Sequence, residues 1–113
     1  MQRLKTRPQF EAALSQRPLA RTVHFSLHCC TSADSDLWLG ALLPKRWAKR
    51  AVTRNAIRRQ VYAVAASVED RLPRCVHVVR LRASFDRTQF MSASSEQLKA
   101  AIRAELQQLF SKA

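Results

Sequence analysis

The stretch from residue 37 to residue 68, LWLGALLPKRWAKRAVTRNAIRRQVYAVAASV, contains the pattern that decides the fold. Residues 37–43 form an almost continuous apolar run, which is typical of a central strand that is covered on both faces. Pro44 ends this run, and residues about 49–68 then show the period of an amphipathic helix. The apolar positions on one face of that helix are Ile57, Val61, Val64 and Val68. The stretch therefore predicts a strand, a basic connection and a long helix.

Similar patterns on both sides of this stretch supply the other elements. Pro8 suits the first turn of a short helix that extends to Gln16. We expect strands at 22–30, 37–43 and 75–81, and helices at 8–16, about 49–68 and about 95–111. The last helix has a stripe of Leu98, Ile102, Leu106, Leu109 and Phe110. The order α-β-β-α-β-α, in which the first strand can be split in two, predicts an α+β fold in a single small domain.

The strand expected at 22–30 alternates between an apolar face and a more polar face. The alternation assigns Val23, Phe25, Leu27 and Cys29 to one face, and His24, Ser26, His28 and Cys30 to the other. We expect the first set to pack in the core. The second set is the candidate for an open, functional face.

The charge balance points to a polyanionic partner. The 113 residues include 20 Lys+Arg and 8 Asp+Glu, which gives a net charge of +12. No acidic residue lies between Asp36 and Glu69, and that gap contains Lys45, Arg46, Lys49, Arg50, Arg54, Arg58 and Arg59. Such clustering is typical of a phosphate-binding face, whereas a solvated basic face without a partner would be costly through self-repulsion. The basic segment also lacks the bulky apolar face of a helix that binds membrane surfaces.

Several classes of protein are excluded by simple features. A hydrophobic content of 47% is enough for one core. No apolar run approaches the ~18 residues of a membrane span, and the N-terminus lacks the apolar stretch of a secretory signal. Three cysteines, of which Cys29 and Cys30 are adjacent, do not suggest a disulfide framework. We therefore expect a reducing, cytoplasmic location.

The start of the long helix is the most informative candidate site. Arg50 and Arg54 lie in the direction of the apolar stripe, but they precede its first member, Ile57. The simplest interpretation is that the first two turns overhang the sheet, so that these arginines line a cleft and bury little. The side chains that point sideways and outward are Asn55, Arg58 and Arg59. Free backbone N–H groups at the helix start favour phosphate further.

The same residues carry a resemblance. Residues 43–59, LPKRWAKRAVTRNAIRR, resemble the signature of the protein subunit of bacterial ribonuclease P, which contains Ala-Val-x-Arg-Asn-Arg-x-Lys-Arg after two basic residues. The matching positions are Gly40, Lys45, Arg46, Ala51, Val52, Arg54, Asn55, Arg58 and Arg59, and the opening Arg3-Leu4-Lys5 with Phe10 is similar too. The chain departs from the family at Ala56, where the family has Arg. It departs again at Leu14 and His28, where the family often has aromatic residues.

The resemblance has consequences for the fold. It implies a mixed four-stranded sheet with helices packed on it, similar to ribosomal protein S5 domain 2. It also implies a left-handed βαβ crossover between the strands at 37–43 and 75–81, against the general right-handed rule. The whole chain, residues 1–113, would be one RNA-binding domain.

The resemblance also implies a function. The protein would bind the catalytic RNA of ribonuclease P and the 5′ leader of precursor tRNA, and would assist the endonucleolytic removal of that leader. Metal ions held in the RNA would perform the hydrolysis. Mg²⁺ would therefore belong to the RNA holoenzyme, and the protein alone would provide no catalytic residue, no metal site and no cofactor. The implied partners are the catalytic RNA and precursor tRNA, not DNA or a membrane.

Two sets of site residues follow from combining the resemblance with the residue pattern. The set for the catalytic RNA is Lys45, Arg46, Lys49, Arg50, Arg54, Asn55, Arg58 and Arg59. The set for a leader-binding cleft is Phe10, Leu14, Ser26, His28, Arg54 and Arg58. Aromatic and imidazole planes in such a cleft can stack on unpaired bases without sequence preference.

Some alternatives remain open at the level of sequence. A ribosomal or general RNA-binding module would have a similar size and charge. A zinc site is disfavoured, although His28, Cys29 and Cys30 could approach Cys75 and His77 across neighbouring strands, because the spacings are unlike those of usual zinc motifs. For the two tryptophans, we expect Trp38 to pack and Trp47 to be available for stacking on RNA.

Overall fold

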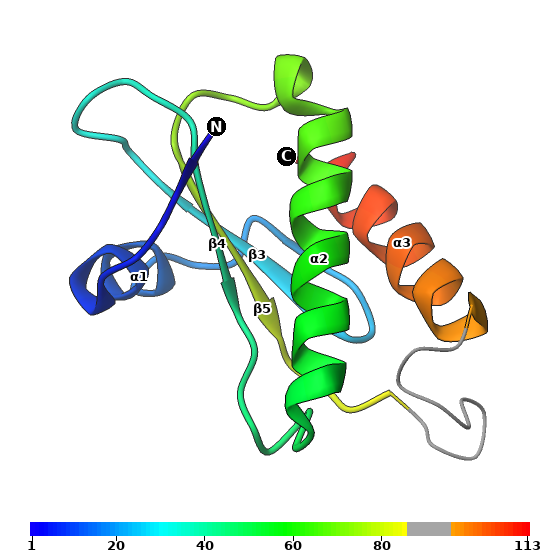
Figure 1. Cartoon of the computed structure of the whole chain (residues 1–113). Coiled ribbons are helices and arrows are strands. Elements are labelled where there is room, and N and C mark those ends of the chain that lie inside the picture. Colours follow the sequence, from blue (N-terminus) through cyan, green and yellow to red (C-terminus); the bar gives the residue numbers. More distant parts are fainter. Residues whose placement is uncertain (86–95) are drawn as a thin grey trace.

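The computed structural model of the chain describes residues 1–85 and 96–113. Its elements are β1 (Gln2–Arg3), α1 (Arg7–Leu14), β2 (Ala20–Arg21), β3 (Phe25–Cys30), β4 (Trp38–Leu42), α2 (Ala51–Ser67), the 3₁₀ helix η1 (Glu69–Arg71), β5 (Val76–Leu81) and α3 (Glu96–Phe110) (Figure 1). The predicted α+β order is confirmed, and residue 95, the expected start of the last helix, lies outside the described residues. Within the described ranges, no helix combines the length and the apolar character that a bilayer span requires.

The strands form one mixed sheet in the order β1-β4-β5-β3-β2. β4 pairs with β5 and β1 in parallel, whereas β3 pairs with β5 and β2 in antiparallel orientation. The strand expected at 22–30 begins only at Phe25, as β3, and the additional short strand, β2, precedes the expected range. The sheet has five strands rather than four, because β1 adds Gln2 and Arg3 beside β4. Two residues are too short to leave a recognisable period in the sequence.

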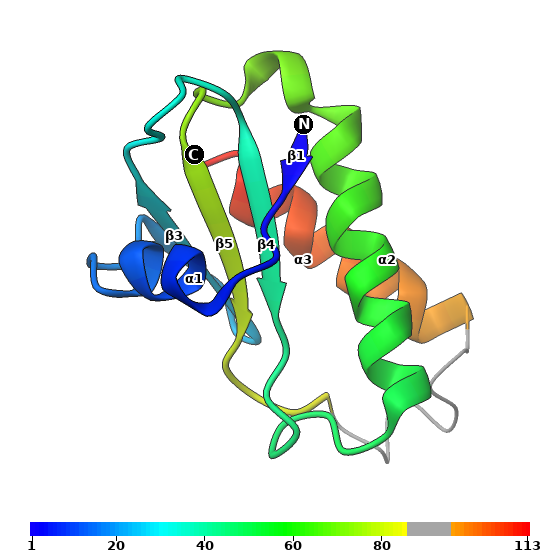
Figure 2. The ribbon, with the colours of Figure 1, turned by 60° about the vertical axis from the view of Figure 1, so that its left-hand side comes forward.

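The helices cover the sheet from both sides. Figures 1 and 2 show α2 and α3 on one face and α1 on the other. The larger core lies beneath α2 and α3, and the predicted apolar stripes of both helices point into it. From the sheet it includes Phe25, Leu27, Leu39, Val79 and Leu81. The smaller core lies beneath α1, around Leu4, Ala13 and Val78. Each face of the sheet therefore has its own apolar core, which holds the helices on that side.

The connection from β4 through α2 to β5 has unusual handedness. β4 and β5 are neighbouring parallel strands, with Gly40 opposite Val78. Figure 2 views the sheet from the α1 side, with both arrows pointing down and β5 to the left of β4. Because α2 covers the far face, this crossover is left-handed, as the resemblance implied.

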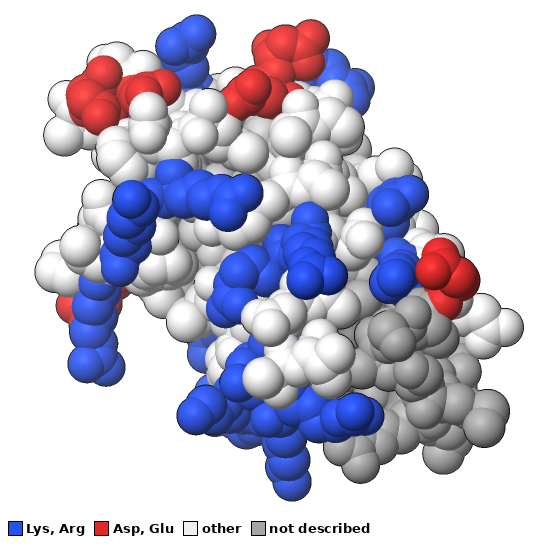
Figure 3. Space-filling model, in the orientation of Figure 1, with Lys and Arg blue, Asp and Glu red and all other residues white. Residues whose placement is uncertain are grey.

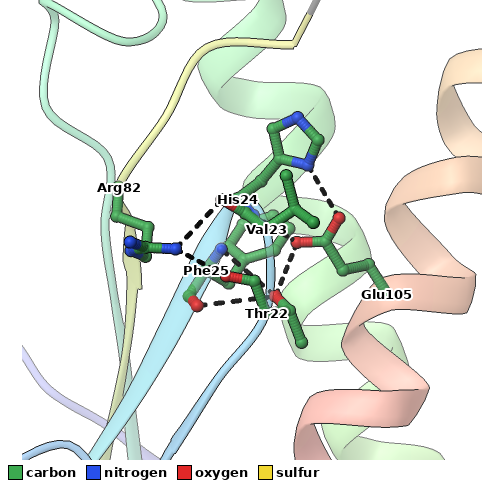
Figure 4. Close-up of polar contacts among 6 residues, drawn as sticks. All are labelled: Thr22, Val23, His24, Phe25, Arg82 and Glu105. Carbon is green, nitrogen blue, oxygen red and sulfur yellow. Dashed lines mark hydrogen bonds and ion pairs between the residues drawn. The ribbon is translucent and has the colours of Figure 1, made fainter.

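The turn between β2 and β3 corrects one sequence expectation. Val23 is 72% exposed instead of buried, and His24 turns toward α3 instead of sharing a face with Ser26. Figure 4 shows the reason: Glu105 of α3 accepts hydrogen bonds from Thr22 Oγ1 (2.6 Å) and the His24 backbone N–H (2.7 Å), and pairs with His24 Nδ1 (2.7 Å). The alternation of the strand therefore begins only at Phe25, and it holds from there to Cys30.

Candidate nucleic-acid interface

A short basic turn connects β4 to α2. The backbone N–H groups of Trp47 and Ala48 both donate to the Pro44 carbonyl, at 3.0 and 3.2 Å, which closes the turn. Its cationic side chains are exposed: Lys45, Arg46, Lys49 and Arg50. Figure 3 shows Lys and Arg side chains gathered at the end of the molecule where α2 begins, while acidic side chains gather mainly at the opposite end. The predicted clustering of charge in sequence is thus a cluster in space.

Arg54 lies in the first turns of α2, but its guanidinium is used by the protein itself. Nη1 of Arg54 donates to the carbonyls of Ala48 (3.0 Å) and Lys49 (2.8 Å). The side chain is half-buried and braces the basic turn. The expectation that this helix start buries little therefore needs correction at Arg54, although it describes the exposed Arg50 well.

The outward side of α2 offers a second group of donors. Arg58 is exposed and donates from Nη1 to Asn55 Oδ1 at 3.2 Å. Asn55 and Arg59 line a shallow groove between α2 and α3. The other residues around this groove are Val52, Ala56, Gln60 and Lys99. Ala56, which stands in the place of an arginine of the family signature, is thus part of a groove between two helices.

A separate pocket of about 270 Å³ opens on the opposite face of the sheet. We call it the arginine pocket; its lining residues are Pro18, Arg21, Ser26, His28, Arg46, Trp47, Arg80 and Arg82. Ser26 faces the pocket because it alternates with Phe25 and Leu27, whose side chains enter the core on the other side. None of these lining residues is acidic. The pocket therefore joins four guanidinium groups, an indole and an imidazole.

His28 forms part of the floor of the arginine pocket. Only 5% of the residue is exposed, its Nε2 lies 3.0 Å from Ser26 Oγ, and its Nδ1 lies 3.4 Å from the Gln16 carbonyl. Burial lowers the pKa of His28; the Gln16 carbonyl partly offsets this effect, and the nearby Arg80 and Arg21 cations reinforce it. The imidazole is therefore neutral near pH 7, and its burial leaves little of the ring free for stacking.

Arg80 and Arg46 give the pocket its capacity for anions. Arg80 Nε is a buried side-chain nitrogen for which the described residues supply no hydrogen-bond acceptor. Such a donor is costly unless a ligand or water satisfies it. The guanidinium of Arg46 lies 5.3 Å from the centroid of the Trp47 ring, and that indole packs partly against the larger core. Trp47 therefore serves the core and the pocket together.

The residues that were assigned to one leader-binding cleft divide between the arginine pocket, the neighbouring small core on the same face of the sheet, and α2. Ser26 and His28 line the arginine pocket, whereas Phe10 and Leu14 pack in the smaller core beneath α1. Phe10 lies over Gly40 so closely that a Cβ there would be 2.5 Å from its ring. Arg54 and Arg58 are not among the lining residues of the pocket.

Sequence reasoning missed three arginines of the pocket, namely Arg21, Arg80 and Arg82. A signal for two of them was available. Arg80 and Arg82 alternate with the buried Val79 and Leu81, so they repeat the pattern used for the strand at 22–30. The antiparallel pairing of β3 and β5 then places Arg80 directly opposite Ser26.

Comparisons with known proteins agree on one family. The model of the Ribonuclease P family matches residues 1–113. The ribonuclease P protein component of Ralstonia pickettii (strain 12J) is 33% identical over 108 residues, which cover 96% of this chain and 76% of the relative. That of Paraburkholderia xenovorans (strain LB400) is 34% identical over 116 residues, with 98% and 79% covered. The solved structure of Staphylococcus aureus RNase P protein has the same fold, with a TM-score of 0.77, 18% identity, and 98% and 94% of the two chains covered.

Proposed function

Because this chain belongs to the ribonuclease P protein family, we propose that it binds the catalytic RNA through the start of α2 and holds the 5′ leader of precursor tRNA in the arginine pocket. Membership of the family supports a role in tRNA 5′ processing as a subunit of an endoribonuclease. The observation that carries the leader assignment is the pocket itself, with four arginines and no acidic residue among its lining.

The composition of the pocket suits a single strand of RNA. Guanidinium groups form paired, charge-assisted hydrogen bonds with phosphate oxygens, and the half-buried indole of Trp47 supplies an aromatic ring on which an unpaired base can stack. These contacts follow the backbone and the base planes, so they tolerate any leader sequence. A subunit that holds the leader would favour precursor tRNA over its product, because mature tRNA lacks the leader.

The exposed cations on the basic turn and on α2 would contact the catalytic RNA. The proposed contacts are Lys45, Arg46, Lys49, Arg50, Asn55, Arg58 and Arg59, with Arg54 bracing the turn from within. Free N–H groups at the start of α2 add a favourable site for phosphate. Arg46 also lines the arginine pocket, so it lies where the two RNA surfaces meet.

We place the hydrolytic Mg²⁺ ions in the RNA partner. Mg²⁺ prefers oxygen ligands in octahedral geometry. The group of candidate metal ligands among the described residues is Cys29, Cys75 and His77, which offers sulfur and nitrogen donors and does not fit this ion. The chain would then bind and orient RNA, and protein freed of RNA should not cleave precursor tRNA.

The test separates the two surfaces with one exposed arginine from each. Arg21→Gln removes a charge from the pocket, whereas Arg59→Gln removes one from the outward side of α2. We expect Arg21→Gln to weaken binding of precursor tRNA to the holoenzyme by about 1–3 kcal/mol and to leave mature tRNA binding unchanged. Arg59→Gln should instead weaken assembly with the catalytic RNA.

The control for loss of charge alone is Arg74→Gln, since Arg74 is exposed and lies outside both surfaces. Equal losses for precursor and mature tRNA with Arg21→Gln would contradict the leader assignment. Equal effects of Arg59→Gln and Arg21→Gln on precursor tRNA binding and on assembly with the catalytic RNA would contradict it as well.

A further inference from the structure

Three potential metal ligands meet on the sheet face beneath α2 and α3. Cys29 of β3 lies opposite His77 of β5 in the antiparallel register, and Cys75 precedes β5 by one residue. Their ligand atoms all lie within 4.8 Å of one another. The sheet separates this cluster from the arginine pocket, because Cys29 packs on the α2 and α3 side whereas its neighbour His28 lines the pocket on the other face. None of the three side chains has a part in the proposed RNA contacts.

The surroundings of His77 orient its ring for metal binding. The residue is fully buried, and its Nε2 lies 3.0 Å from the Pro73 carbonyl. Only a protonated Nε2 can donate to that oxygen, so Nδ1 carries the free lone pair, which faces Cys29 Sγ at 3.0 Å. Cys75 Sγ lies beside the other ring nitrogen, 3.3 Å from Nε2. Histidines that bind metals typically donate their other N–H to a backbone carbonyl in this way. The outer shell of a metal site is therefore already built.

We propose that Cys29 Sγ, Cys75 Sγ and His77 Nδ1 bind one soft divalent ion of the zinc type. A tetrahedral ion with bonds of about 2.3 Å to sulfur and about 2.1 Å to nitrogen holds its ligand atoms about 3.4–3.8 Å apart. To complete the site, Cys29 Sγ has to move slightly away from Nδ1, and Cys75 Sγ has to turn from Nε2 toward Nδ1. Each thiol releases its proton to solvent as its sulfur binds the ion. Three protein ligands leave the fourth position to water or to an external ligand.

Cys30 provides a natural contrast. It is the neighbour of Cys29 and is also half-buried, but its side chain packs in the smaller core beneath α1, on the other face of the sheet. It therefore cannot join the other ligands without reversal of the strand. A site that depends on this geometry must require Cys29 and ignore Cys30.

The experiment uses the reduced full chain and Co²⁺ as a spectroscopic probe for Zn²⁺. We expect one Co²⁺ per chain, with thiolate-to-cobalt charge-transfer bands and the visible bands of tetrahedral coordination. Zn²⁺ should then displace the Co²⁺ and abolish these bands, and it should raise the unfolding temperature because it binds the folded chain. Absence of thiolate charge-transfer bands in the folded, reduced chain would overturn the proposal.

Variants identify the ligands. Cys29→Ser and Cys75→Ser should each weaken the metal affinity by more than the ~10–100-fold that loss of an outer-shell partner causes, whereas Cys30→Ser should retain the affinity and the spectrum. Circular dichroism shows whether each variant is folded. If Cys29→Ser does not fold, Cys75→Ser decides, because Cys75 precedes β5 and does not lie within a strand. An equal loss with Cys30→Ser would refute the site.

Discussion

Glu105 connects α3 to the turn that precedes β3. Its carboxylate accepts from Thr22 Oγ1 and the His24 backbone N–H, and it pairs with His24 Nδ1. We expect Glu105→Gln to lower the free energy of unfolding by about 1–3 kcal/mol, because it weakens charge-assisted hydrogen bonds at a half-buried site. Urea denaturation measures this loss.

Glu96→Gln is the matched control on the same helix. The Glu96 side chain is 91% exposed and pairs only loosely with Lys99, at 3.5 Å. Its loss should cost no more than about 0.5 kcal/mol. Similar losses in the two variants would mean that the contacts of Glu105 contribute little.

Buried histidines predict a loss of stability in mild acid. Burial lowers the pKa of both His28 and His77 below the ordinary value of 6.5. Between the folded and unfolded pKa values the unfolded chain binds more protons, so stability is fully present above about pH 6.5 and falls as the pH drops further. Urea midpoints measured between about pH 8 and about pH 5 should decline, and a flat or rising profile would contradict this account.

At the scale of residues, the sequence predicted which face of the sheet a side chain occupies better than it predicted the burial and the contacts of that side chain. Alternation correctly assigned Ser26 and His28 to the face opposite Phe25. It could not show that His28 is buried, because the Gln16 carbonyl that contacts its ring belongs to the segment after α1, far from β3 in the sequence. It failed at Val23 and His24, where a distant carboxylate on α3 determines the turn. Contacts between elements leave no local period to detect.

The N-terminal segment of α2 combines the proposed RNA contacts with a structural role. Arg54 donates to two carbonyls of the basic turn, whereas the exposed Arg58 donates to the Asn55 side chain on the surface. We therefore expect Arg54→Gln to reduce the free energy of unfolding by about 1–3 kcal/mol and Arg58→Gln by no more than about 0.5 kcal/mol. Thermal unfolding of the two variants distinguishes them. If Arg54→Gln is as stable as Arg58→Gln, the brace is not important for the fold.

At the scale of elements, the long periodic segments were predictable and the short ones were not. The stripes of α2 and α3 follow from spacing alone, and both were confirmed as core. β1 is held by pairing with β4 and by the Arg3 guanidinium, which lies 4.2 Å from the Tyr62 ring centroid on α2. The cluster of Cys29, Cys75 and His77 likewise exists only through strand pairing. The spacing of these three residues along the chain therefore argued against a metal site.

For the whole molecule, a net charge of +12 predicts RNA binding that depends strongly on salt. Binding of a short single-stranded RNA should weaken as salt rises, with a slope of about 0.7 per phosphate contact. Arg21→Gln should make that slope shallower by about this amount, whereas Arg74→Gln should leave it unchanged. Titrations at several salt concentrations give the slopes, and an unchanged slope in Arg21→Gln would remove that residue from the phosphate contacts.

The order of the strands also bears on how the free protein avoids self-association. Both edges of the sheet, β1 and β2, are two residues long, while the longer β3, β4 and β5 are interior. A neighbouring chain can add a strand only where unpaired backbone groups form a continuous edge. Here that edge is too short to template growth. The shortness of these two edge strands therefore works against fibril-like stacking at β1 and β2, in addition to the repulsion between the charges of this basic chain.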